Sequence, residues 1–134
     1  MQQLSPMQLQ IYQHFKARIE EQNSVLSSSN LEMQKLQKDM VGVIQKIQES
    51  DLTKNKLDII EPEASLYKVV GPALIKVTRE EVNNEVKGRL DLLNKTLKSQ
   101  EDNKKKLHEA AKTAQENMVR LDSEFKYAIQ QVNK

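Results

Sequence analysis

Residues 66–77, LYKVVGPALIKV, decide the fold of this chain. Two runs rich in aliphatic and β-branched residues, Leu66–Val70 and Ala73–Val77, flank the dipeptide Gly71-Pro72. A two-residue hairpin loop with glycine first is typical of a type II′ turn, because the first central residue of that turn needs a positive φ. Pro72 fits the second central position, where its fixed negative φ is tolerated. The stretch therefore predicts a β-hairpin over residues 66–77.

The predicted hairpin carries apolar side chains on both of its faces, because successive side chains of a strand point to opposite sides. An isolated two-stranded hairpin is marginal in water, and its edges leave backbone groups unpaired. The chain offers no further strand, so we expect strands of other chains to complete the sheet. The alternative is a hairpin that folds back onto its own helices. The predicted oligomerisation residues are Leu66, Tyr67, Val69, Val70, Gly71, Pro72, Leu74, Ile75 and Val77.

The composition of the whole chain is too polar for a compact globule of normal core size. Of the 134 residues, 37% are hydrophobic and 30% are charged, and the mean hydropathy is −0.71. Such a composition suits long helices with a narrow apolar seam. The net charge is only +2, with both signs interspersed, so neither nucleic acid nor an acidic membrane is expected as a partner.

Targeting and redox signals are also absent from the sequence. The chain has no cysteine, which excludes disulfides and Cys-ligated zinc and fits a reducing compartment. No signal peptide or membrane-spanning run is visible in it. We therefore expect a cytoplasmic protein without a membrane partner.

The segment before the hairpin predicts a long helix that starts at a capping box. Ser5 can be the N-cap and Gln8 its third-position partner, and apolar residues then recur at alternating spacings of three and four. We expect this helix over about residues 6–50, followed by a connector over residues 51–65. Within this connector, Asp51 can cap a short helical piece that ends near Leu57. The alternative is that the first helix simply continues, because Leu57 stays in heptad phase.

The segment after the hairpin repeats the same pattern. Thr78 can be the N-cap and Glu81 closes a second capping box. The heptads that follow predict a second helix over about residues 79–132. Because the hairpin reverses the chain between two apolar seams, the sequence predicts a mainly α fold: a long antiparallel two-helix coiled coil with a central β-hairpin, in one domain over residues 1–134.

One register of the two seams gathers their polar positions in a single zone. In that register Ser29 lies beside Lys104, and Phe15 faces Met118. Phe125 would then meet only Gln8 at the start of the first helix. We expect this register because it keeps most apolar seam residues opposite apolar partners.

Apolar and aromatic side chains gather where the two helix termini meet. Four of the five aromatic residues lie there, Tyr12, Phe15, Phe125 and Tyr127. Ile129 and Val132 are expected to run past the start of the first helix. One coiled coil cannot bury all of these groups, and exposed apolar patches usually mark binding surfaces. The alternative is that they cap the seam or fray. The predicted binding tip consists of Met7, Leu9, Ile11, Tyr12, Phe15, Phe125, Tyr127, Ile129 and Val132.

The sequence predicts no catalytic, cofactor or metal site. His14 and His108 are far apart and have no second ligand at metal spacing. There is no glycine-rich phosphate loop and no nucleophile elbow. An enzyme is therefore not expected.

The hairpin and the residues after it resemble prefoldin β-type subunits, most closely the subunit-six branch of that family. Leu66–Lys76 reads much like the family's hairpin, and Val86–Asp91 is similar to its lysine-arginine-leucine-aspartate stretch, with Gly88 where a lysine is common. The resemblance covers nearly the whole chain by architecture, but its specific motif is confined to about residues 65–91. The approach to the hairpin, Glu61–Glu63, departs from the family pattern.

This resemblance implies a subunit of a hexameric co-chaperone. Two α-type and four β-type prefoldin subunits join their hairpins in an intersubunit β-barrel. The coiled-coil tips hold unfolded polypeptides, such as actin and tubulin, and deliver them to the cytosolic group II chaperonin without ATP. The competing interpretation is a structural or tethering coiled coil, which explains the heptads equally well but not the hairpin with two apolar faces.

Overall fold

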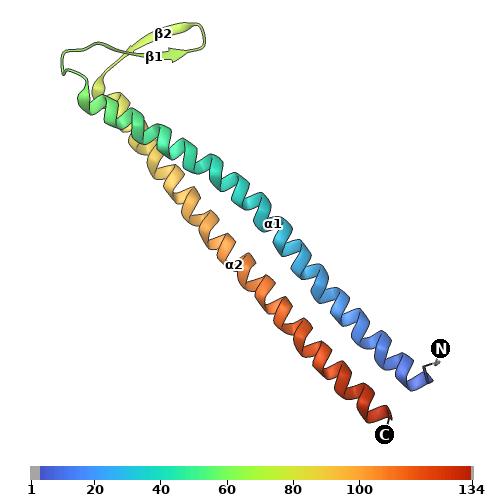
Figure 1. Ribbon diagram of the computed structural model, residues 1–134. Helices are drawn as coiled ribbons and strands as arrows, with labels where there is room; N and C mark the ends of the chain where they lie inside the picture. The colour runs from blue at the N-terminus through green and yellow to red at the C-terminus, as the bar shows by residue number, and fades with distance from the viewer. Residues whose placement is uncertain (1–3, 134) are drawn as a thin grey trace. The chain divides into compact units, whose positions relative to one another are not determined.

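The computed structural model of this chain describes residues 4–133 and consists of two long helices joined by a β-hairpin (Figure 1). The elements follow the order α1 (Pro6–Ile59), β1 (Leu66–Val70), β2 (Ala73–Val77) and α2 (Arg79–Asn133). The predicted fold class, two long helices around a central hairpin, is confirmed. The outermost positions of the predicted domain, residues 1–3 and 134, lie outside the described residues.

The residues of the chain group by spatial proximity into two compact units. The hairpin unit comprises Gln37–Asp102 and so contains both strands with the adjoining halves of the two helices. The terminal unit comprises the described residues up to Leu36 and those from Asn103 onward. In each unit, segments of α1 and α2 contact each other in antiparallel orientation.

α1 is longer than expected, because it runs nine residues beyond the predicted end at Ser50. Ser50 and Leu57 are both buried in the hairpin unit, so the seam continues through the segment expected as a connector. The predicted connector over residues 51–65 is wrong, and the alternative of a continuous helix holds. Of that segment, only residues 60–65 lie outside the helices and strands. There Ala64 N donates to Glu61 O at 3.0 Å.

Both helices begin with the predicted capping boxes. Gln8 N donates to Ser5 Oγ at 3.2 Å, and Ser5 N donates to Gln8 Oε1 at 3.0 Å. Glu81 N donates to Thr78 Oγ1 at 3.1 Å, and Thr78 N donates to Glu81 Oε2 at 3.2 Å. These bonds satisfy amide groups that the first helical turn leaves without a partner.

The two strands pair antiparallel, with Leu66 opposite Val77 and Val70 opposite Ala73. The loop between them is therefore the dipeptide at positions 71 and 72. Gly71 has a φ of 56°, the only positive φ among the described residues. This geometry is that of the type II′ turn that the sequence predicts.

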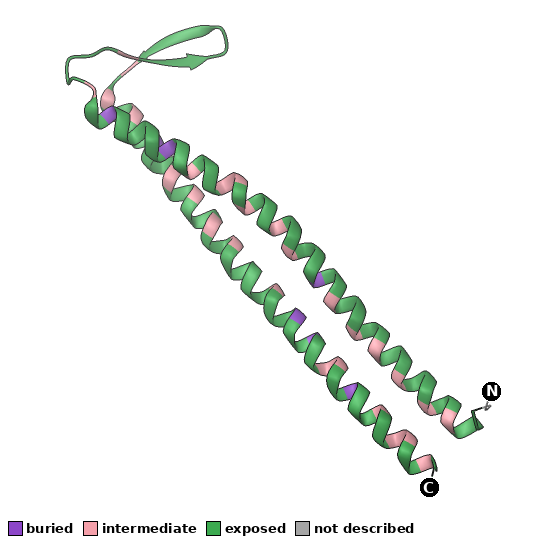
Figure 2. Cartoon of the chain, in the orientation of Figure 1, coloured by how far each residue is buried: buried purple, intermediate pink, exposed green. Residues whose placement is uncertain are grey.

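The seam of each unit buries few residues, and most of the surface is exposed (Figure 2). In the terminal unit, Ser29, Ala111, Ala114 and Leu121 are buried. In the hairpin unit the buried residues are Ser50, Leu57 and Val86. Two helices can enclose only such a narrow core, which agrees with the low hydrophobic content of the sequence.

The predicted register is wrong by one heptad in the terminal unit. Phe125 packs against Phe15 and Tyr12, with ring centroids 5.7 and 6.3 Å apart and edge-to-face geometry. The sequence places Phe125 seven residues beyond Met118, the expected partner of Phe15. Aromatic pairs in this geometry are stabilising beyond their buried area. In the observed register Phe125 therefore has apolar partners, whereas the predicted register placed it opposite Gln8 alone.

A polar pair supports the same register. Asn117 Nδ2 donates to Gln22 Oε1 at 3.2 Å in a partly buried position, so each amide offsets the desolvation of the other. The predicted register placed Ser29 beside Lys104. In the structure Ser29 is buried whereas Lys104 is exposed, so the two do not form a pair in the seam.

Candidate functional site

The hairpin exposes apolar side chains on both of its faces. Tyr67, Val69 and Leu74 lie on one face, and Val70 and Ile75 lie on the other. The exposed fractions of these five residues run from 48% to 71%. Neither face is covered within the hairpin unit (Figure 2), so the hairpin does not fold back onto its own helices. The two outer edges of the sheet are likewise unpaired among the described residues.

One ion pair ties the hairpin to α2. Lys68 Nζ lies 2.9 Å from Glu85 Oε1, and Arg89 Nη2 lies 3.6 Å from the same oxygen. The hydrogen bond and positive charge of Lys68, with a smaller contribution from Arg89, lower the pKa of Glu85. The pair holds β1 at a fixed place beside the first turns of α2.

The first residue of α2 closes the end of α1. The guanidinium of Arg79 donates to the carbonyl oxygens of Leu57, Ile60 and Glu61, at 3.0, 2.6 and 2.8 Å. The last turn of a helix leaves its carbonyls without intrahelical partners. α1 has no glycine after its end to supply the usual backbone cap. Arg79 takes over that role and fixes both ends of the segment that carries the hairpin.

Sequence reasoning missed Arg79, Lys68 and Glu85. The signal for Arg79 was the end of α1, where Ile59, Ile60 and the next two residues include no glycine or asparagine. A helix that ends this way needs an outside donor for its last carbonyls. For Lys68 and Glu85 no comparable local signal exists, because they are 17 residues apart and are brought together only by the angle of the hairpin.

The terminal unit brings the central members of the predicted tip together. Tyr12, Phe15 and Phe125 form one aromatic cluster from both helices. A groove of about 180 Å³ opens beside it. The residues that line the groove are Tyr12, Phe15, Lys16, Ile19, Glu20 and Phe125.

The other predicted tip residues lie around this cluster. Met7, Leu9 and Tyr127 are exposed, whereas Ile11, Ile129 and Val132 are half-buried. Gln8 Nε2 donates to Asn133 Oδ1, so the end of α2 lies level with the start of α1. The expectation that Ile129 and Val132 run past the first helix is therefore wrong, for the same one-heptad reason.

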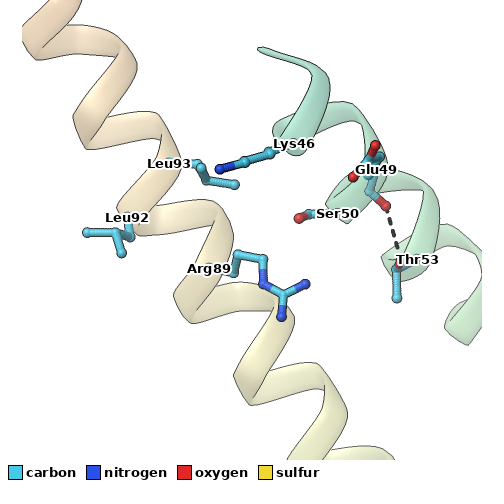
Figure 3. Close-up of a pocket in the computed structure, with 7 residues that line it drawn as sticks. All are labelled: Lys46, Glu49, Ser50, Thr53, Arg89, Leu92 and Leu93. Carbon is cyan, nitrogen blue, oxygen red and sulfur yellow. Dashed lines mark hydrogen bonds between the residues drawn. The ribbon is translucent and has the colours of Figure 1, made fainter. Parts of the chain in front are cut away.

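A second, larger groove lies in the hairpin unit between the two helices and has a volume of about 510 Å³ (Figure 3). Lys46 and Arg89 extend into it from opposite helices, while Thr53 Oγ1 donates to Glu49 O at 3.0 Å (Figure 3). Its other lining residues are Ser50, Leu92 and Leu93. The groove combines hydroxyls, aliphatic groups and charges of both signs, as on the flank of an ordinary coiled coil.

The described part of the chain contains neither a candidate metal cluster nor a helix able to span a membrane. Within residues 4–133, no group of three His, Cys, Asp or Glu side chains is arranged to hold a metal ion. Over the same residues, neither helix contains a stretch apolar enough to cross a membrane.

Both the sequence and the fold of this chain are similar to those of known proteins. Residues 20–121 match a family profile described as prefoldin subunit. The chain is 38% identical over 63 residues to the probable prefoldin subunit 6 of Dictyostelium discoideum, covering 47% of this chain and 45% of that protein. It is 34% identical over 76 residues to the probable prefoldin subunit 6 of Drosophila melanogaster, covering 52% of this chain and 61% of that protein. These alignments thus span about half of the relatives' lengths.

Among solved structures, the crystal structure of the prefoldin beta subunit from Thermococcus strain KS-1 has the same fold. The two structures superpose with a TM-score of 0.72 at 21% sequence identity. The superposition covers 88% of this chain and 94% of that chain.

Proposed function

This chain belongs to the prefoldin subunit family, and from that premise we propose that it is one subunit of a hexameric, ATP-independent co-chaperone. In this proposal its hairpin joins an intersubunit β-barrel with other α-type and β-type prefoldin subunits. Its tip holds unfolded polypeptides, such as actin and tubulin, and delivers them to the group II chaperonin in the cytoplasm. The chain itself has no catalytic role.

The observation that carries the proposal is the exposure of both hairpin faces. Tyr67, Val69 and Leu74 would face water in an isolated chain, as would Val70 and Ile75. Burying a large apolar side chain stabilises by about 1.5–3 kcal/mol, and unpaired strand edges accept further strands. Strands from neighbouring subunits would satisfy both the apolar faces and the edges.

The tip supports the second half of the proposal. Tyr12, Phe15 and Phe125 present an apolar groove of about 180 Å³, and exposed Met7 adds a flexible side chain that adapts to clients of no fixed shape. A groove this small binds weakly. Several tips acting together on one client would raise the overall affinity through effective concentration.

The test is an aggregation assay on the assembled hexamer. The chain is co-expressed with the other prefoldin subunits, and the purified hexamer is mixed with actin diluted from denaturant, without ATP. We expect light scattering from aggregated actin to fall in proportion to added hexamer. A hexamer that forms but leaves actin aggregation unchanged would favour the structural or tethering coiled coil instead.

A further inference from the structure

The hairpin has little apolar packing to hold its direction. Within β1 and β2 only Leu66 and Val77 are half-buried, and they form the strand pair nearest to the helices. Every other strand residue is exposed. Elements of a fold are normally oriented by the apolar surface that they bury against each other. The direction of this hairpin therefore depends largely on polar contacts.

The first polar contact is the ion pair of Lys68 with Glu85, at 2.9 Å. The two side chains are 48% and 42% exposed, so water screens their attraction. Exposed pairs of this kind contribute little to stability. The ion pair alone is a weak restraint on the hairpin.

The second polar contact is made by Arg79 and is stronger. The guanidinium donates to the carbonyl oxygens of Leu57 and Ile60 in partly buried positions, and also to that of Glu61. Hydrogen bonds from a charged donor are stronger than neutral ones, and the planar guanidinium presents several donors in a fixed geometry. Arg79 is therefore the main polar restraint on the hairpin.

The place of Arg79 in the chain lets it act on both ends of the hairpin. Arg79 follows β2 after a single residue, Thr78. Its acceptors lie in the last turn of α1 and at the start of residues 60–65, which lead into β1. One side chain thus connects the segment that enters the hairpin with the residue at which the chain leaves it. Because residues 60–65 form no helix or strand, their direction is set by such contacts.

A fixed direction matters when strands of neighbouring subunits add to the hairpin. An added strand must meet the edge in one register and with one face inward. A hairpin that is free to swing loses that freedom on binding, which lowers the affinity, whereas a pre-oriented hairpin avoids this cost.

We propose that Arg79 is a positioning residue for assembly. It holds the hairpin in the direction in which strands of neighbouring subunits add to it, although Arg79 is not itself part of the hairpin. This inference rests on the proposed function, because it assumes that the hairpin joins the barrel. It adds a residue outside the hairpin to those on which assembly depends.

A titration of hexamer assembly tests the inference. The full chain is added at increasing concentration to the other prefoldin subunits, and its incorporation is followed by native mass spectrometry. We expect Arg79→Ala to need on the order of tenfold more chain for half-maximal incorporation. Arg79→Lys should fall between Arg79→Ala and the wild type, because it keeps the charge but not the planar fork. Arg120→Ala removes an exposed arginine elsewhere on α2 and should assemble as the wild type does.

A second control separates positioning from stability. Val86 is buried in the seam of the same unit, and Val86→Ala removes apolar contacts from that seam without touching the carbonyls that Arg79 binds. Chemical denaturation compares the two variants. We expect Val86→Ala to be at least as destabilised as Arg79→Ala and yet to assemble as the wild type does. Incorporation that is lost equally in both variants would show that Arg79 acts only through stability, and would overturn the inference.

Spin labels measure the direction of the hairpin without any partner. The chain has no cysteine, so Lys76→Cys in β2 and Lys95→Cys in α2 can carry one label each, at exposed positions of the hairpin unit. We expect pulsed electron paramagnetic resonance on the full chain to give a narrow distance distribution, and a broad one when Arg79→Ala is added. Equal widths, or wild-type incorporation of Arg79→Ala into a hexamer, overturn the inference while the proposed function stands. A wild-type chain that never enters a hexamer overturns the proposed function and the inference together.

Discussion

Arg79 lies 3.0 Å from the carbonyl oxygen of Leu57, so the first residue of α2 closes the last turn of α1. The same guanidinium also binds the carbonyls of Ile60 and Glu61. One planar donor group thus binds three carbonyls at and just beyond the end of α1. The hairpin is held between two helix ends that share this residue.

Arg79→Ala should destabilise the end of α1. We expect the free energy of unfolding to fall by about 1–3 kcal/mol, because partly buried carbonyl groups lose a charged donor. Amide exchange of Ile60, whose N–H donates to Lys56 O at 3.1 Å, should accelerate. Arg79→Lys keeps the charge but not the planar fork, so it should recover only part of the loss. Unchanged exchange at Ile60 in Arg79→Ala would contradict the capping role.

The ion pair of Lys68 and Glu85 should itself depend on pH. The pKa of Glu85 is lowered in the folded state, so its contribution is present above the ordinary glutamate pKa of about 4.3. That contribution is lost as the pH falls through the lower, folded-state pKa. An NMR titration of the Glu85 carboxyl should show the lowered pKa.

Substituting each cation in turn separates the contributions of Lys68 and Arg89 to the lowered pKa of Glu85. Lys68→Met should return the pKa of Glu85 toward its ordinary value, since Lys68 is its main cause. Arg89→Met should have a smaller effect, because Arg89 lies 3.6 Å from the carboxyl instead of 2.9 Å. Identical titration curves for the wild type and Lys68→Met would rule out the pair in solution.

Gly71→Val should impair assembly without melting the helices. A β-branched residue at a φ of 56° is strained by about 1–3 kcal/mol. An added Cβ at this position meets no atom within 4 Å, so the expected effect comes from backbone strain and not from a clash of the Cβ. We expect less of the variant in the hexamer by native mass spectrometry, with the helical circular dichroism signal retained.

Gly88→Ala is the matched control for that substitution. Gly88 lies within α2, and an added Cβ there also meets no atom within 4 Å. Alanine in a helix interior is favoured over glycine by up to about 1 kcal/mol, so stability should rise and assembly should not change. Wild-type assembly of Gly71→Val would show that the turn geometry is dispensable.

The tip can be tested by the triple substitution Phe125→Ser, Ile129→Ser and Val132→Ser. We expect weaker suppression of actin aggregation by the assembled hexamer, because the triple variant removes one ring of the aromatic cluster and the apolar side chains beside it. Incorporation into the hexamer should be unchanged, since the hairpin is untouched. Leu31→Ser, also exposed but outside the tip, is the control. The tips of the other subunits are tested in parallel. If a hexamer with the triple variant still suppresses actin aggregation fully, this chain's tip does not bind the client.

The observed register of the terminal unit is open to disulfide trapping. Cysteines replacing Gln22 and Asn117 should crosslink under mild oxidation, because these side chains already touch. The register first expected places Gln22 beside Ala111 instead, and cysteines at those positions should not crosslink. Preferential formation of the disulfide between positions 22 and 111 would instead support the register that the sequence predicts.

The local features of the fold could be predicted because each is coded within a few residues. Gly71-Pro72 determines a turn with one positive φ, and the boxes at Ser5 and Thr78 start the two helices. The end of α1 was misplaced near Ser50, although Leu57 stays in heptad phase beyond it. In the structure Ser50 is simply a buried small residue in a continuous seam.

The register could not be predicted in the same way. Sliding two heptad seams by seven residues keeps every apolar position on the seam, so periodicity alone does not distinguish the two alignments. Some of the side chains that distinguish the two alignments lie beside the seam and not in it. Asn117 is a flanking residue whose pairing with Gln22 is visible only once the helices are aligned. The predicted hairpin and tip residues remain proposals as sites of assembly and client binding.

The uncovered hairpin also has a consequence for the cell that makes this protein. Val69, Val70, Leu74 and Ile75 form short, apolar, β-prone segments with open edges, which is the signature of sequences that aggregate through their edges. If the hairpin joins the barrel proposed above, a newly made chain would carry this hazard until the barrel forms. In that case its synthesis would have to keep pace with that of the other subunits, and any surplus would be a hazard rather than a harmless reserve.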